Sequence, residues 1–375
     1  MSNSRTNWQR FKELTILMVG LGVIGVLVLV TGVFPIKASS GHWPITTWVL
    51  DFASDRSVAF HSAGIESPPL DEPGMIRLGA ASYDANCRWC HGRPGLPEPR
   101  VPGEMTPSPP FFPTAKLDHE PRELFYIVKH GIKFAGMPAW TARQREDEIW
   151  PLVAFLKSFP ELEEATYLDH VEVAMETDSA VTQLVAAACA ACHGPHGHGR
   201  AGDRVPMIAG QNREYLQLTL EAYKTGQRHS GIMEPIAARL TAEDIRRLAD
   251  YFSNQSEHAA ASQTVEASSH SASADLATLT ESERRLYDLG ESLAIHGDGP
   301  QKIASCNECH GPTNGDHNAE YPRLQGQPAK YLRRQLQLFA DSLRGGTENV
   351  DLMHPIANKL SEEQIDALAL YYSRQ

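Results

Sequence analysis

The sequence is poor in cysteine, and none of its six cysteines lies outside three short Cys-x-x-Cys-His motifs. No motif therefore has a second Cys or His pair, which argues against structural zinc because such sites need four ligands. Positive charge is also scarce: 34 Lys and Arg stand against 46 Asp and Glu, giving a formal net charge of −12. An acidic surface of this kind argues against nucleic acid as a partner.

Charge is absent altogether from Leu14 to Ile36. At about 1.5 Å per residue, such a helix is long enough to cross a hydrocarbon layer of about 30 Å. We expect a cytoplasmic N-terminus at 1–13 and a transmembrane anchor at 14–36, because the basic residues precede the run. The alternative is a cleaved signal peptide, whose apolar region is usually shorter, about 7 to 15 residues. The rest of the chain is then periplasmic, at a bacterial inner membrane crossed once.

The three Cys-x-x-Cys-His motifs predict the chemistry. They comprise Cys87, Cys90 and His91; Cys189, Cys192 and His193; and Cys306, Cys309 and His310. Two thiols one helical turn apart can form thioethers with the vinyl groups of haem c, and the adjacent imidazole can bind the iron. One copy could be chance, a redox dithiol or half of a zinc site. Three copies, each with the trailing His, predict three covalently bound haem c groups.

Each motif is followed by a methionine that shares a register with the other two. Met137, Met233 and Met353 precede an isoleucine by twelve residues and an aromatic residue by eighteen. The stretches that follow predict amphipathic helices with capping residues at their first turn, as at Thr241 and Ser361. An isolated methionine is usually core filler, but this shared register predicts the sixth iron ligands. Met105 in repeat 1 and His354 beside Met353 are weaker competitors.

Two proline loops repeat as well. Pro206 and Pro322 each precede a Gly-Gln pair and a Tyr-Leu pair at matching positions. A proline carbonyl there can accept a hydrogen bond from the proximal imidazole and fix its orientation. The alternative is a simple turn. The loop after His91 is rich in proline but lacks this pattern, so its partner stays unassigned.

On these motifs, residues 180–254 and 290–375 resemble the two halves of a cytochrome c4-type dihaem protein. Residues 74–160 resemble a further monohaem class I cytochrome c domain more loosely. The resemblance implies an all-α fold of small domains, His/Met haems and electron transfer. We expect three cytochrome c domains, at 74–160, 179–254 and 279–375, referred to below as repeats 1, 2 and 3.

The remaining segments are expected to connect these domains. Residues 37–73 form a juxtamembrane connector, in which Trp48 and Phe52 fall at helical spacing and lie either along the membrane or against repeat 1. Residues 161–178 are acidic and are expected to join repeats 1 and 2. Residues 255–278 are rich in Ser and Ala and predict a flexible linker.

Two protein ligands on each iron leave no open position for substrate, so we expect an electron-transfer protein with no catalytic residues. Its donor and acceptor would be redox proteins. The preferred version is a tethered carrier between a quinol-oxidising complex and a terminal oxidase. The alternative is the cytochrome subunit of a periplasmic dehydrogenase. A peroxidase or reductase with an open haem in repeat 1 is the rival from another class.

Overall fold

The computed structural model describes residues 3–33, 36–255, 276–311 and 318–375. These residues are almost entirely helical and contain no β-strand, only two isolated bridges, Ile132 with Met137 and Asp298 with Ile303. The all-α prediction is confirmed. The helices up to repeat 2 are α1 (Asn3–Thr31), η1 (Ala38–Ser40), α2 (Pro44–Ser62), α3 (Pro73–Asn86), α4 (Arg88–His91), α5 (Arg100–Gly103), α6 (Pro121–His130), η2 (Glu146–Glu148), α7 (Ile149–Ser158), η3 (Phe159–Glu161) and α8 (Glu164–Val171). The later ones are α9 (Ala180–Ala188), α10 (Ala190–His193), α11 (Arg213–Lys224), α12 (Met233–Ala237), α13 (Ala242–Ser253), η5 (Leu276–Thr278), α14 (Glu281–His296), α15 (Asn307–His310), α16 (Ala329–Ala340), α17 (Val350–Ala357) and α18 (Glu362–Ser373).

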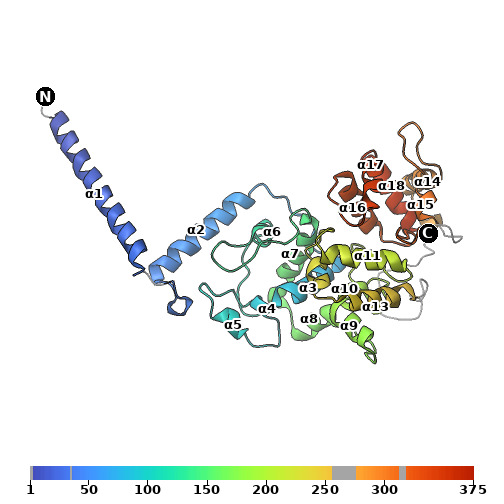
Figure 1. Ribbon diagram of the computed structural model, residues 1–375, viewed down its shortest axis with the longest axis horizontal. Coiled ribbons are helices and arrows are strands. Elements are labelled where there is room, and N and C mark those ends of the chain that lie inside the picture. Colours follow the sequence, from blue (N-terminus) through green and yellow to red (C-terminus); the bar gives the residue numbers. More distant parts are fainter. Residues whose placement is uncertain (1–2, 34–35, 256–275, 312–317) are drawn as a thin grey trace.

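The N-terminal helix α1 projects away from the other helices (Figure 1). The segment Asn7–Thr31 is long and apolar enough to cross a membrane. Its mean hydropathy is 2.7, and it is not buried against the rest of the protein. The helix ends at Thr31 and not at Ile36, the expected end of the span. Gly32 takes a φ of 65°, a left-handed conformation that commonly terminates helices at glycine.

The next helix, α2, is exposed in its first half and packs against repeat 1 in its second half. Trp48 and Phe52 in its first half are exposed, whereas Val58 and Ser62 in its second half are buried. The second half packs against α6 of repeat 1, where His61 meets the ring of Tyr126 edge-on. The exposed apolar half lies closer in the chain to α1.

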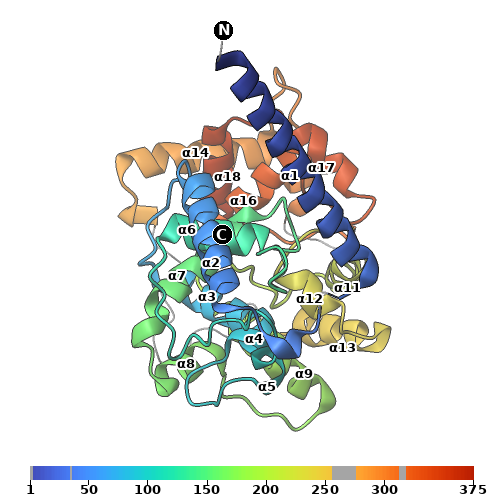
Figure 2. The same cartoon turned by 90° about the vertical axis from the view of Figure 1, so that its left-hand side faces the viewer.

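In every repeat the first helix packs against the last one: α3 on α7, α9 on α13 and α14 on α18. The isoleucines at the shared register, Ile149, Ile245 and Ile365, are each at most 1% exposed. Capping boxes begin α13 at Thr241 and α18 at Ser361, as predicted. Figures 1 and 2 both show the helices of repeat 3 gathered on one side of those of repeats 1 and 2.

The expected connector 161–178 packs against both neighbouring repeats. It contains α8, whose Tyr167 is fully buried in the core of repeat 1 and donates a hydrogen bond to Asp84 at 2.7 Å. Val173 and Met175 then pack against the core of repeat 2. This segment is therefore part of both cores and not a free tether. Most of the expected linker 255–278 lies outside the described residues.

Candidate haem-binding sites

The three Cys-x-x-Cys-His motifs share one backbone geometry. Each forms a short helix, α4, α10 or α15, in which the histidine N–H donates to the carbonyl of the first cysteine. These N–O distances are 3.0 Å at His91, 2.9 Å at His193 and 2.8 Å at His310. The two thiols of each motif are therefore held one helical turn apart, as attachment to two vinyl groups requires. All six cysteines are free of disulfides.

Each of the three histidines is fixed by a proline carbonyl. The Nδ1 atoms of His193 and His310 lie 3.0 and 2.9 Å from the carbonyl oxygens of Pro206 and Pro322. Both predicted partners are confirmed. In repeat 1 the sequence left this partner unassigned, and the structure supplies Pro110, whose oxygen lies 3.0 Å from Nδ1 of His91. Because a carbonyl only accepts, Nδ1 carries the proton and Nε2 keeps its lone pair for a metal.

Burial also favours the neutral, metal-binding form of two of these imidazoles. It lowers the pKa of His91 and of His193, while their proline carbonyls act in the opposite direction. Burial raises the pKa of the Cys87, Cys189 and Cys192 thiols to about 12. Redox-active Cys-x-x-Cys pairs usually have a thiol pKa lowered to about 3.5 to 7.5, which is the opposite direction. Among the residues that the structure describes, no group of three or more His, Cys, Asp or Glu could hold a metal ion.

The three candidate methionines lie in two kinds of local structure. Met233 begins α12 and Met353 lies within α17, in both cases two residues before a proline. Met137 lies in a tight hairpin, where it pairs with Ile132 after Gly136 at a φ of 73°. Met105 lies close to this hairpin, because a Cβ on Gly136 would be 2.2 Å from its terminal methyl group. Repeat 1 therefore has two methionines in this region, of which the shared register favours Met137.

Repeats 2 and 3 share one cavity of about 710 Å³, within the usual range of about 300 to 1,000 Å³ for cofactor sites. Both halves contribute the same set of groups: two cysteines, the histidine, the proline and the methionine. They are Cys189, Cys192, His193, Pro206 and Met233 from repeat 2, and Cys306, Cys309, His310, Pro322 and Met353 from repeat 3. The two predicted haem sites therefore open into a common interior.

Two buried arginines in this cavity test whether haem fits. Arg228 and Arg344 are 4% and 8% exposed, and within the described residues neither is paired with a carboxylate. Arg228 donates to Tyr331 and Gln335, and its Nε has no partner. Burial and the neighbouring Arg228 lower the pKa of Arg344 to about 10. Burying an unpaired cation costs on the order of several kcal/mol, so the pair fits a ligand with acidic groups, such as the propionates of haem.

The contact between repeats 2 and 3 is reciprocal. Gln211 accepts from the backbone N–H of Arg323 at 2.8 Å and donates to its carbonyl at 3.0 Å. At the matching position, Gln327 accepts from the N–H of Met207 at 3.1 Å and donates to its carbonyl at 2.6 Å. Both glutamines are 5% exposed. Equivalent residues exchange equivalent bonds, which is the pattern of a two-fold related interface.

The helical repeats, the paired cysteines and the oriented imidazoles define a c-type cytochrome. The family described as "Cytochrome c" matches residues 179–256 and 298–373, and the one described as "Cytochrome C oxidase, cbb3-type, subunit III" matches residues 74–156. The chain belongs to the class I c-type cytochromes and includes a cytochrome c4-like segment. Its role is electron transfer.

Individual relatives match about half of the chain. The "Thiosulfate dehydrogenase electron acceptor" of Stutzerimonas stutzeri is 34% identical, covering 50% of this chain and 79% of that protein. Cytochrome c4 of Azotobacter vinelandii is 32% identical, covering 52% and 87%. Reduced recombinant cytochrome c4 from Pseudomonas stutzeri, a solved structure, is 31% identical, covering 53% and 98%, with a TM-score of 0.41.

Proposed function

We propose that this chain is a three-haem, membrane-anchored cytochrome that accepts electrons from a periplasmic dehydrogenase and passes them on. The observation that carries the proposal is the imidazole–proline hydrogen bond, present in all three motifs at 2.9 to 3.0 Å. It prepares three histidines to bind iron through Nε2. Bound haem c would supply a one-electron couple at each site.

The residues around each site have distinct roles under this proposal. The six motif cysteines attach haem covalently, and His91, His193 and His310 supply the proximal ligands. Met137, Met233 and Met353 supply the sixth ligands, which excludes substrate from the iron and raises the potential. Repeats 1, 2 and 3 each form one haem domain, with boundaries at 74–160, 179–254 and 279–375. The peroxidase or reductase alternative would require an open iron in repeat 1.

The direction of electron flow rests on the relatives. A relative named as a thiosulfate dehydrogenase electron acceptor favours the dehydrogenase-linked version over the carrier from a quinol-oxidising complex to a terminal oxidase. The oxidase remains a second candidate as the electron sink, because repeat 1 matches a family named for an oxidase subunit. With a dehydrogenase as donor and an oxidase as acceptor, electrons would enter at the c4-like repeats 2 and 3 and leave through repeat 1.

The membrane placement follows from α1. A retained helix Asn7–Thr31 would anchor the chain in the inner membrane and hold the three haem domains on the periplasmic side. A signal peptide cleaved after this helix would instead release them. N-terminal sequencing of the mature, membrane-bound protein distinguishes the two.

The proposed function is tested by purifying the chain from membranes, counting covalent haem by pyridine haemochrome and gel haem staining, and measuring reduction by candidate dehydrogenases. Three haems per chain, all with the far-red band of ferric His/Met haem, would support it. Fewer haems, or a high-spin site that reacts with peroxide, would favour the enzyme alternative. Reduction only by a quinol-oxidising complex would favour the carrier version.

A further inference from the structure

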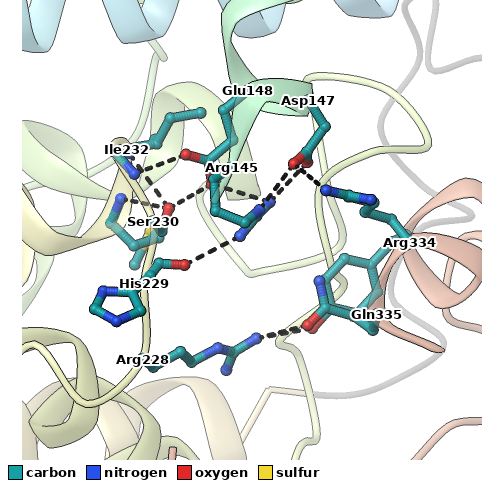
Figure 3. A network of polar contacts seen from close by, with 12 residues as sticks. Arg145, Asp147, Glu148, Arg228, His229, Ser230, Ile232, Arg334 and Gln335 are labelled. Carbon is teal, nitrogen blue, oxygen red and sulfur yellow. Dashed lines mark hydrogen bonds and ion pairs between the residues drawn. The ribbon is translucent and has the colours of Figure 1, made fainter. Parts of the chain in front are cut away.

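Repeat 1 contacts repeat 2 through a buried carboxylate. Glu148, in the 3-10 helix η2 of repeat 1, is only 6% exposed (Figure 3). Its Oε1 accepts a hydrogen bond from the Ser230 hydroxyl at 2.6 Å, and its Oε2 accepts from the Gly231 N–H at 2.7 Å. Charge-assisted bonds of this kind are among the strongest that a protein forms. The carboxylate therefore holds a short backbone segment of the neighbouring repeat.

That segment leads directly into Met233. The Ser230 hydroxyl, which donates to Glu148, accepts from the backbone N–H of Met233 at 3.0 Å and of Ile232 at 3.3 Å. Ser230 is 2% exposed. A continuous chain of hydrogen bonds thus runs from the carboxylate of repeat 1 to the backbone of the predicted sixth ligand in repeat 2.

The charge of Glu148 is balanced within repeat 1. Arg145 lies 3.0 Å from Oε1 of Glu148 and makes two further bonds to Asp147. The same guanidinium donates to the carbonyl of His229 at 3.3 Å, just before the held segment. Asp147 in turn receives a bond from Arg334 of repeat 3 at 2.9 Å. Burial raises the pKa of Glu148, whereas Arg145 and the donors at Ser230 and Gly231 act in the opposite direction and favour its role as an acceptor.

Packing leaves the segment no room to shift. A Cβ on Gly231 would lie 2.2 Å from the ring of Trp140, which is itself buried and follows Met137 by three residues. Repeat 3 has no equivalent of this arrangement, because Val350 stands where Ser230 stands in repeat 2 and cannot bridge through a hydroxyl. This chain of hydrogen bonds is therefore a feature of the Met233 segment and not of the Met353 segment.

We propose that Glu148 is a positioning residue for Met233, so that iron ligation in repeat 2 depends on the docking of repeat 1. The proposal rests on the proposed function, in which Met233 is the sixth ligand. It predicts that the potential and ligation of the second haem site respond to a side chain in another domain.

The test uses the full-length, haem-loaded chain and four variants. Glu148→Gln keeps the shape but has one acceptor oxygen and an NH₂ group that repels the second donor. Ser230→Ala removes the bridge, and Ser230→Thr restores a hydroxyl. Asp147→Asn is the matched control, because Asp147 shares Arg145 but makes no bond to residues 230–233. Measured for each are the far-red band, carbon monoxide binding to the reduced protein and the potentials.

We expect Glu148→Gln and Ser230→Ala to lose up to one third of the far-red absorbance, the share of one site in three. Both should gain up to one carbon monoxide site per chain and lower one potential. Ser230→Thr and Asp147→Asn should retain the wild-type spectrum. The Glu148→Gln and Ser230→Ala changes should also combine less than additively, since they break the same chain of bonds.

Wild-type spectra and potentials in both Glu148→Gln and Ser230→Ala would overturn the proposal while leaving the haem assignment intact. Loss of covalent haem from repeat 2 in Glu148→Gln would also overturn it, because the carboxylate would then serve folding of the repeat. A Met233→Ala variant that keeps the full far-red band would instead show that the ligand assignment, and with it the positioning role, is wrong.

Discussion

Repeat 2 contacts its two neighbours in different ways. At its contact with repeat 3, Gln211 of repeat 2 and Gln327 of repeat 3 make matching bonds at matching positions, beside an ion pair of Asp203 with Lys330. Toward repeat 1 it meets the buried carboxylate of Glu148, whose bonds with Ser230 and Gly231 run in one direction only. Two similar units can meet through one surface used twice, whereas a dissimilar unit needs residues found only in itself. The c4-like pair and the added repeat 1 therefore differ in how their junctions should respond to mutation and pH.

The largest expected effect tests whether repeats 2 and 3 behave as a pair. Cys189→Ala should remove or weaken covalent haem in repeat 2, lowering haem staining by up to one third. Because Cys189 lines the cavity shared with repeat 3, the spectrum of site 3 should also change. The spectrum of site 1 should stay as in the wild type, and Cys87→Ala is the reciprocal control. Equal disturbance of sites 1 and 3 would contradict the paired arrangement.

The next effect concerns the methionine of repeat 1. Met137→Ala should open one iron to carbon monoxide and lower its potential, because imidazole alone then remains as a protein ligand. Met105→Ala is a suitable control, since this thioether lies near Gly136 in the same region. Absorbance of the carbon monoxide complex of the reduced protein measures both. A carbon monoxide site in Met105→Ala but not in Met137→Ala would exchange the two assignments.

The sequence predicted the sites of repeats 2 and 3 better than the site of repeat 1. The register placed Ile149, Ile245 and Ile365 correctly in the helix cores, and the matching loops identified Pro206 and Pro322. Pro110 was missed because it follows its histidine by 19 residues, against 13 and 12 in the other repeats. A repeat pattern carries information only where the spacing repeats.

The contacts between repeat 1 and distant parts of the chain could not be predicted from local sequence patterns. Glu148 stands in an acidic first turn that is typical of a solvated helix start, yet its partner Ser230 lies 82 residues further along the chain. The burial of Tyr167 was likewise not predicted, because the residue lies in an acidic segment. A large aromatic residue in such a segment was the one local indication of a core contact. Long-range polar contacts depend on how the repeats dock, and no periodicity within a repeat encodes that docking.

A smaller effect is expected at the amide contact of repeats 2 and 3. Gln211→Ala leaves the N–H and carbonyl of Arg323 without the glutamine partner, and an unsatisfied buried polar group costs about 1 to 3 kcal/mol. Gln327→Ala should cost a similar amount, since it makes the same bonds to Met207. Urea unfolding of the haem-loaded chain measures both. Gln217→Ala removes only a bond to Glu221 within α11 and should cost less, about 0.5 kcal/mol. Unequal costs for the two buried glutamines would contradict the symmetry of the contact.

The smallest effect is a pH dependence at the ion pairs of Glu72. Glu72, at the start of α3, contacts Lys330 of repeat 3 at 2.8 Å and Arg204 of repeat 2 at 3.3 Å. Burial raises the pKa of this carboxyl, but the bonds and charges of Lys330 and Arg204 outweigh it and lower the pKa below the ordinary 4.5. A lowered folded-state pKa means that the stabilisation is present above the ordinary pKa and is lost as the pH falls through the folded one.

Because the pair is partly exposed, its contribution should be small, about 0.5 kcal/mol. Glu72→Gln should therefore be slightly less stable than the wild type at neutral pH and equally stable in acid, where both side chains are uncharged. Urea midpoints between pH 3 and pH 7 measure the difference. The Gln211→Ala deficit should instead be constant over this range, since no titrating group takes part in that bond. If the Glu72→Gln difference were constant and the Gln211→Ala difference faded in acid, the assignment of the titrating contact to Glu72 and of the neutral contact to Gln211 would be wrong.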